Sequence, residues 1–177
     1  MDTEKITHVL IVANWRKKES HEMSETIARY LGERGIRSTV FKTMTANEKI
    51  HIEEGTGLVI CLGGDGTVLY CARYLHSYGI PILAVNLGTF GFVTEISVDE
   101  WQEAIDLLLE GKHAISRRLM IRTTVIRDQK RVYSAHALNE MVVASSGISK
   151  LINMALKVDD KEAGFFRSDG IIIATPT

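Results

Sequence analysis

The sequence predicts an α/β domain built on a doubly wound parallel sheet, followed by the start of an all-β domain. Three observations point to this fold class. Short apolar runs rich in β-branched residues alternate with segments of helical periodicity from residue 8 to residue 109. A glycine-rich segment at 63–67 separates one of these runs from a helical pattern, as is typical of α/β folds. After residue 112, β-favouring stretches follow one another without a further helix.

Each element of the first domain follows from its apolar pattern. Four runs too short for helices are predicted as buried parallel strands, at 8–13, 37–41, 58–62 and 81–85. Three segments with apolar residues at helical spacing are predicted as helices, at 23–31, 67–75 and 97–109. Ser97 and Glu100 are predicted to form a capping box for the third helix, and Gly35 and Gly111 to end the first and third. This alternation is typical of a Rossmann-like sheet, whose ligands gather beyond the carboxyl ends of the strands.

The second domain is predicted from β-favouring stretches at 118–127, 131–144, 151–158 and 170–174, with turns at 128–130 and 159–162. We expect the domains to cover 1–112 and 113–177. A sheet made of these strands alone would leave an exposed edge, which native proteins cover. We therefore expect that chain beyond residue 177 completes this domain.

Composition and charge exclude several classes of function. The formal net charge is -1 and the basic residues are dispersed, so there is no basic stripe for nucleic acid. The sequence has no run of about 18 apolar residues and no export signal, so no membrane span is expected. Cys61 and Cys71 form no disulfide framework, which predicts a cytoplasmic protein. The six histidines show no zinc-binding spacing, so no metal ligands are assigned.

Residues 63–67, Gly-Gly-Asp-Gly-Thr, are the strongest indication of chemistry. Gly63, Gly64 and Gly66 are expected to allow positive φ and a close approach of the backbone to a ligand. The helix that follows points unpaired N–H groups and its positive dipole end at the same place, which favours an anion. A carboxylate at Asp65 costs Coulomb energy beside a phosphate unless it accepts a proton, faces a metal or holds a hydroxyl. The combination therefore indicates catalysis on a phosphate compound.

This segment resembles the GGDGT signature of the NAD kinases, and three further segments resemble motifs of that family. Residues 86–95 (NLGTFGFVTE) are similar to its NLGTLGFLTE segment, and residues 138–140 (LNE) to its NE motif. Residues 167–177 (RSDGIIIATPT) resemble the start of its DGLIxxTPTGSTAY segment. The four blocks follow the family's order and imply a phosphofructokinase-like sheet. GGDGT alone also occurs in lipid kinases that act on diacylglycerol and sphingosine, and the phosphofructokinases carry a close relative.

The resemblance implies a role for a set of residues. Asp65 would be the base for the adenosine 2′-hydroxyl of NAD. Gly63, Gly64, Gly66 and Thr67 would bind the phosphates of the donor. Nucleotide contacts are implied for Phe92, Asn139, Glu140, Lys150, Arg167, Asp169 and Thr177.

For several of these residues a structural role is the alternative. Asp65 and Asp169 would then be turn or helix-cap residues. Asn139 and Glu140, which we expect inside a strand over 137–144, would be a polar pair at a strand kink or a wet edge. Packed or solvated side chains are the alternative for Phe92, Lys150 and Arg167.

The expected function is that of an NAD kinase. The γ-phosphoryl group of ATP, or a phosphate of inorganic polyphosphate, would pass to the 2′-hydroxyl of NAD to give NADP. A divalent cation, Mg²⁺, is expected with the donor because few basic groups lie near the glycine segment in the sequence. The resemblance also implies a homo-oligomer, a dimer or tetramer, that shares site residues between subunits. The two alternatives are a lipid kinase with the shared GGDGT segment and a catalytically silent dinucleotide-binding fragment.

Overall fold

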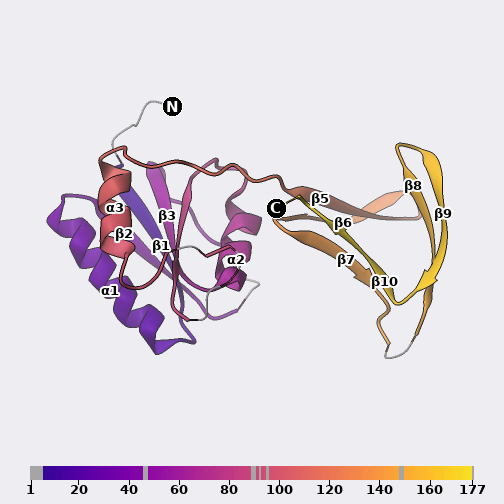
Figure 1. Ribbon diagram of the computed structural model, residues 1–177, viewed down its shortest axis with the longest axis horizontal. Helices are drawn as coiled ribbons and strands as arrows, with labels where there is room; N and C mark the ends of the chain where they lie inside the picture. Colours follow the sequence, from indigo (N-terminus) through magenta and orange to yellow (C-terminus); the bar gives the residue numbers. More distant parts are fainter. Residues whose placement is uncertain are drawn as a thin grey trace. The chain divides into compact units, whose positions relative to one another are not determined.

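The chain divides into two compact units, Met1–Arg117 and Arg118–Thr177. Figure 1 shows the computed structural model, which describes residues 6–45, 48–88, 91, 93–94, 96–147 and 150–176. In these described residues the first unit contains a four-stranded sheet and three helices, and the second consists of antiparallel strand pairs. The predicted fold class is therefore confirmed.

The sheet of the first unit is entirely parallel, with the strand order β2-β1-β3-β4. Its strands are β1 His8–Asn14, β2 Arg37–Thr43, β3 Thr56–Gly63 and β4 Ile82–Asn86. Each strand matches a predicted run to within two residues at either end. The chain runs from β1 to its neighbour β2 on one side, and from β3 to its neighbour β4 on the other. The strand order therefore reverses between β1 and β3.

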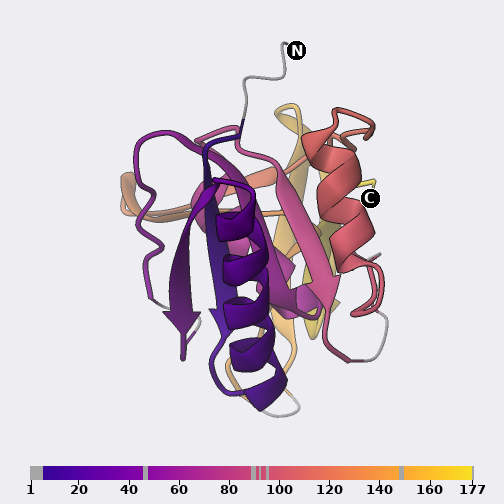
Figure 2. The ribbon, with the colours of Figure 1, turned by 90° about the vertical axis from the view of Figure 1, so that its left-hand side faces the viewer.

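Three helices cover the two faces of this sheet: α1 Lys18–Glu33, α2 Asp65–Leu75 and α3 Trp101–Leu109. Helices α1 and α3 lie on one face and α2 on the other (Figures 1 and 2). In β1, Val9, Ile11 and Ala13 join the core cluster with α1 and α3, while Leu10 and Val12 are buried on the opposite face. Burial on both faces explains why the strands are continuous apolar runs. None of the described helices is long and apolar enough to cross a membrane.

All three helices begin at other residues than predicted. Helix α1 begins at Lys18, five residues before the predicted start at 23. Helix α2 begins at Asp65, two residues before Thr67, so that the aspartate lies in its first turn. Helix α3 begins at Trp101 and not at Ser97. The Ser97 N–H and hydroxyl both donate to the Glu100 carboxylate, at 2.9 and 2.6 Å, and close a separate turn before the helix. The predicted capping box is wrong because the serine hydroxyl donates to the carboxylate, whereas a capping residue accepts a bond from a helix N–H.

The second unit consists of three antiparallel pairs, β5–β6, β7–β10 and β8–β9. Its strands are β5 Ile121–Arg127, β6 Lys130–Ala137, β7 Glu140–Ala144, β8 Ile152–Val158, β9 Lys161–Ser168 and β10 Gly170–Ala174. Two-residue turns with positive φ, at 128–129 and 159–160, connect β5 to β6 and β8 to β9. The single stretch predicted over 131–144 is wrong, because a bend at 138–139 divides it into two strands. Strand β9 was not predicted.

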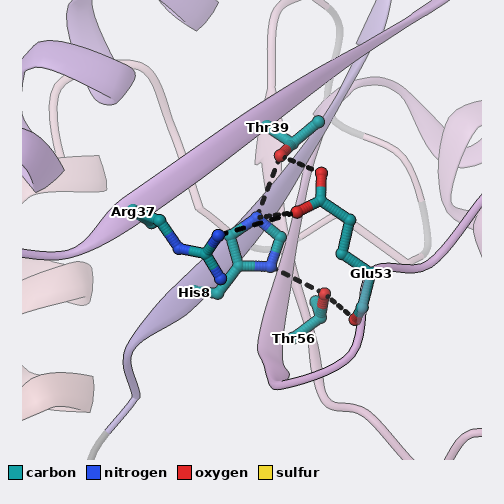
Figure 3. Close-up of polar contacts among 5 residues, drawn as sticks. All are labelled: His8, Arg37, Thr39, Glu53 and Thr56. Atoms are coloured by element: carbon teal, nitrogen blue, oxygen red, sulfur yellow. Dashed lines mark hydrogen bonds and ion pairs between the residues drawn. The ribbon is translucent and has the colours of Figure 1, made fainter.

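A polar cluster around the buried His8 lies at the amino ends of β1, β2 and β3 (Figure 3). The His8 ring nitrogens Nδ1 and Nε2 lie 2.8 Å from the Thr56 hydroxyl and 2.9 Å from the Thr39 hydroxyl. Both hydroxyls donate to Glu53 at 2.7 Å, Thr39 to its carboxylate and Thr56 to its main-chain carbonyl. Arg37 Nη1 lies 4.0 Å from the same carboxylate. The cluster thus supplies a partner for each polar atom of the buried imidazole.

Candidate active site

A pocket opens at the carboxyl edge of the parallel sheet, where the crossovers after β1 and β3 run to opposite sides. In open α/β sheets this reversal leaves a crevice in which ligands bind. The pocket has a volume of about 470 Å³. It is lined by Asn14, Arg16, Lys17, Thr43, Met44, Thr45, Gly64, Gly66, Thr67 and Tyr70. The glycine segment at 63–67 therefore lies on the predicted edge, and it forms one wall of this pocket.

The glycine segment is shaped by close packing and not by positive φ. Gly63, Gly64 and Gly66 are described, and none of them has the positive φ expected from the sequence; the N-cap Gly64 has φ -105° and ψ -167°. A Cβ on Gly63 would overlap the hydroxyl of Thr67, so glycine is required there for space. The Thr67 N–H already donates to the carbonyl of the N-cap Gly64 at 2.9 Å, and the N–H groups before it begin the helix at this segment. The segment is thus a helix N-terminus presented to the pocket.

The Asp65 carboxylate is held by a second glycine-containing segment. Its Oδ1 accepts hydrogen bonds from the N–H groups of Val93 at 3.1 Å and Thr94 at 3.2 Å, and from the Thr94 hydroxyl at 3.3 Å. A Cβ on Gly91 would overlap this carboxylate, so the backbone approaches Asp65 more closely than any other residue type would allow. These bonds reach about 28 residues along the chain, which a turn or cap residue does not do. The geometry orients the carboxylate, and its role as a base stays a prediction.

The pocket and the carboxylate lie on different sides of the same turn. Gly64, Gly66 and Thr67 line the pocket, whereas Asp65 does not and turns its carboxylate to the segment at 91–94. Two cations, Arg16 and Lys17, line the pocket, and among the described residues no acidic side chain does. The sequence-based expectation of few basic groups near this segment is therefore wrong, because the loop after β1 folds against the loop after β3.

The sequence did contain an indication that Arg16 and Lys17 belong to the site. Arg16 and Lys17 follow directly after β1, and in a parallel sheet the residues after each strand meet at one edge. Gly91, Val93 and Thr94 lie in the 86–95 segment that resembles a family motif, but the sequence does not show that they contact the aspartate, because these contacts depend on how the segment folds back.

The predicted nucleotide contacts of the second unit lie at two ends of one strand pair. Asn139 stands in the bend before β7, and its carbonyl accepts the N–H of Thr175 at 2.7 Å. Our expectation that Asn139 and Glu140 lie inside a strand is wrong for Asn139, while Glu140 is the first residue of β7. The β7–β10 ladder runs from the Ala174–Glu140 pair to the pair beside Asp169. Four residue steps of about 3.4 Å separate these ends, so the structure does not bring Glu140 and Asp169 together.

The remaining predicted contacts are exposed or undescribed. Lys150 is exposed, and so is Arg167, which follows Phe165 and Phe166 in β9. Phe92 and Thr177 lie outside the described residues, so their predicted contacts stay predictions.

Two further observations concern metal and cysteine chemistry. Among the described residues, no group of three or more histidine, cysteine, aspartate or glutamate side chains is placed to hold a metal ion. Cys61 and Cys71 are free and buried. A hydrogen bond with Cys61, together with burial, raises the pKa of the Cys71 thiol well above its usual value, so the thiolate is disfavoured. Both cysteines are accordingly core residues.

The fold and the site together define an α/β domain of the GGDGT type, with a pocket at the switch point of its sheet that is lined by two cations and the start of a helix. Residues 9–113 match the family model of the ATP-NAD kinase N-terminal domain, and the chain belongs to this family. The chain is 39% identical over 169 residues to the NAD kinase of Treponema denticola, covering 96% of this chain and 60% of that protein. It is 33% identical over 170 residues to the NAD kinase of Nitratidesulfovibrio vulgaris, with the same coverage.

A solved structure shares the fold over nearly the whole chain. The crystal structure of yeast NADH kinase complexed with NADH matches with a TM-score of 0.83 and 20% sequence identity. The match covers 98% of this chain and 59% of the yeast chain. The chain therefore spans about three fifths of the length of the relatives that it matches.

Proposed function

We propose that the protein containing this chain is an NAD kinase that transfers the γ-phosphoryl group of ATP to the adenosine 2′-hydroxyl of NAD. Membership of the ATP-NAD kinase family supports the reaction class. The observation that carries the proposal is the two-sided turn at 64–67, with an anion pocket on one side and the oriented Asp65 carboxylate on the other. A kinase needs both parts: a site for the donor phosphates and a group that takes a proton from the attacking alcohol.

The chemical step uses the carboxylate directly. The 2′-hydroxyl transfers its proton to Asp65 as its oxygen forms a bond to the γ-phosphorus. The bond between that phosphorus and the oxygen that bridges to the β-phosphate breaks, and ADP leaves with the electron pair. Because Val93 and Thr94 hold the Asp65 carboxylate in place, it need not reorient during the reaction. The N–H groups at the start of α2 stabilise the negative charge of the donor.

A divalent cation, Mg²⁺, is proposed to accompany the donor. In such sites Mg²⁺ takes most of its ligands from phosphate oxygens and water, with one or two carboxylates from the protein. The described residues fit this arrangement, because they form no cluster of their own and offer one carboxylate, Asp65, beside the glycine segment. When bound, the cation neutralises charge on the phosphoryl oxygens.

Further contacts, the assembly and the location belong to the same proposal. Asn139, Glu140, Lys150, Arg167, Asp169, Phe92 and Thr177 are proposed as nucleotide contacts. Because Glu140 and Asp169 lie at opposite ends of a strand pair, we assign them to different parts of the dinucleotide. We also propose a homo-oligomer in the cytoplasm, where the buried free thiols of Cys61 and Cys71 would remain reduced. Polyphosphate is proposed as a second donor.

The test compares NADP formation by the wild type and Asp65→Asn, in the 177-residue chain and in a version extended to the length of its relatives. Asparagine keeps an oxygen that can accept from Val93 and Thr94, so the fold is retained while the base is lost. We expect turnover to fall by at least about a hundredfold and NAD binding to be retained. The exposed Asp99→Asn is the matched control and should keep its activity.

The outcomes separate the alternatives. Wild-type turnover in Asp65→Asn would disprove the base assignment. No NADP from either wild-type version would disprove the proposed kinase and favour a silent dinucleotide-binding protein. Turnover in the extended version alone would place the activity in the longer protein and leave the role of Asp65 to be read from its variant there.

A further inference from the structure

The turn between β1 and α1 is fixed to the sheet at both of its ends. The Trp15 N–H donates to the carbonyl of Thr43, at the end of β2, at 3.0 Å. The buried Ser20 hydroxyl donates to the carbonyl of Leu62, near the end of β3, at 3.2 Å. The turn therefore spans the ends of β2 and β3 and crosses the point at which the strand order reverses.

The two basic residues of this turn have an ordered backbone. Asn14, the last residue of β1, accepts the Arg16 N–H on its side-chain oxygen at 3.2 Å and the Lys17 N–H on its carbonyl at 3.0 Å. Lys17 is also the N-cap residue of α1. These bonds hold the main chain, so only side-chain freedom is lost when a ligand binds.

Arg16 and Lys17 have no acidic partner among the residues that the structure describes. In the part of the chain that the structure describes, neither side chain takes part in an ion pair, whereas the next residue, Lys18, pairs with Glu22 at 3.3 Å. The described residues that line the pocket include no carboxylate either. Two like charges at one pocket repel each other, and a bound anion would relieve this repulsion.

The other walls of the pocket favour the same kind of ligand. The start of α2 contributes Gly64, Gly66 and Thr67 to the lining, and the N-terminal N–H groups of a helix bind phosphate. The Lys17 Nζ lies 3.6 Å from the position that a Cβ of Gly88 would occupy, so the ammonium reaches the loop after β4. A volume of about 470 Å³ is sufficient for a small-molecule ligand.

We propose that Arg16 and Lys17 bind the phosphate chain of the phosphoryl donor, on the side of the α2 turn away from the Asp65 carboxylate. The ligand class is a chain of linked phosphates, supplied by a nucleoside triphosphate or by inorganic polyphosphate. The guanidinium can hold two phosphate oxygens at once, and the ammonium acts as a point charge. This inference rests on the proposed kinase function and names residues of its donor site that no sequence motif had assigned.

Calorimetric titration of the 177-residue chain tests the inference without any need for turnover. The probes are tripolyphosphate, ATP and AMP, each with and without Mg²⁺, and the variants are Arg16→Gln and Lys17→Gln. We expect each variant to weaken tripolyphosphate and ATP binding by about tenfold to a hundredfold, as loss of a charged hydrogen bond does. AMP should bind weakly to all forms, because it lacks the linked phosphates. Loss of ATP binding with retention of tripolyphosphate binding would overturn the proposal.

The matched control is Lys18→Gln, which removes the same charge one residue further along but from a side chain paired with Glu22. It should change affinity by less than about twofold, since exposed charges are screened by salt. Arg16→Lys and Lys17→Arg keep the charge and should retain part of the binding. An equal loss in Lys18→Gln would show a general charge effect and overturn the proposal.

Kinetics of the active, extended protein separate donor from acceptor. Arg16→Gln and Lys17→Gln should raise KM for ATP and leave KM for NAD unchanged. A rise in KM for NAD alone would place the acceptor in the pocket and overturn the inference.

Failure of the kinase proposal can be distinguished from failure of the phosphate-site proposal. If no form makes NADP but tripolyphosphate binding still depends on both residues, the kinase proposal fails and the phosphate site stands. If NADP forms and both variants match the wild type, the phosphate site fails alone.

Discussion

Polar side chains gather at both edges of the parallel sheet, and the two edges differ in how these side chains are satisfied. At the amino edge, His8, Thr39, Thr56 and Glu53 bond to one another. At the carboxyl edge, Arg16 and Lys17 face a pocket without an acidic partner in the described residues, and helix α2 begins there. At the amino edge the polar side chains are satisfied by hydrogen bonds to one another. At the carboxyl edge, the positive charges of Arg16 and Lys17 have no acidic partner among the described residues.

This difference separates a structural cluster from a candidate binding site. A buried imidazole beside two hydroxyls and a carboxylate has the composition of a catalytic group, but each ring nitrogen already has a partner. No buried side-chain nitrogen or oxygen among the described residues lacks a hydrogen-bond partner. Unsatisfied capacity for an anion, and not the number of polar residues, therefore makes the carboxyl edge the candidate binding site.

The largest expected effect comes from adding one methyl group at each edge. In Gly91→Ala the new Cβ overlaps the Asp65 carboxylate, which must move. In Gly57→Ala, on β3, the nearest atom is Ile6 Cγ1 at 3.5 Å, an ordinary contact. We expect NADP formation by the extended protein to fall by about a hundredfold or more in Gly91→Ala and to be unchanged in Gly57→Ala.

Urea unfolding of both alanine variants keeps this comparison interpretable. Gly91 is exposed, so we expect its variant to unfold near the wild-type midpoint although its turnover is lost. Full turnover in Gly91→Ala would mean that the position of the carboxylate is not critical. Loss of turnover in Gly57→Ala would remove the distinction between the two edges.

The fold was largely predictable because both faces of the sheet are buried. Burial makes β1 and β3 continuous apolar runs, and the glycine segment after β3 has its own signature. The helix starts were less predictable, since Ser97 and Glu100 carry a capping pattern whose bonds close a separate turn. The local sequence does not show whether the Ser97 hydroxyl will accept from a helix N–H or donate to the Glu100 carboxylate.

The candidate site was predictable only in part, for a related reason. Asp65 is marked by the glycines around it, whereas Arg16 joins the pocket through strand order, which a single sequence does not state. Asn139 was expected in a strand because the residues on either side favour β structure, yet the chain bends there. Contacts between distant segments are decided by tertiary packing, and motifs reveal them only where one segment carries its own pattern.

A smaller effect, on stability alone, is expected from His8→Ala at the amino edge. The residue is 1% exposed and bonds to two hydroxyls, so its removal leaves a cavity and takes from each hydroxyl one of its two partners. We expect the free energy of unfolding in urea to fall by about 2–4 kcal/mol. Turnover per folded molecule of the extended protein should match the wild type, because the carboxyl edge is untouched. Lost turnover in a folded variant would give the amino edge a functional role.

The smallest expected effect is on stability in acid, through Glu53. A hydrogen bond from the Thr39 hydroxyl lowers the pKa of the Glu53 carboxyl below its usual 4.5, with smaller contributions from His8, Arg37 and His51, while desolvation opposes the shift. A carboxyl whose pKa is lower in the folded state binds its proton more readily when unfolded. Its contribution to stability is therefore complete above about pH 4.5 and is lost as the pH falls through the lowered pKa of the folded state.

Thr39→Val removes the largest cause of this shift and should flatten the decline in the free energy of unfolding as the pH falls below about 4.5. The matched control is Thr26→Val, because the Thr26 hydroxyl donates to the main-chain carbonyl of Glu22, which does not titrate. Urea unfolding at several pH values compares the slopes of the three proteins. A slope in Thr39→Val equal to that of the wild type would show that the hydroxyl does not hold the carboxylate. The amino edge would then be closed by packing rather than by its hydrogen bonds, and its contrast with the carboxyl edge would rest on the unpaired cations alone.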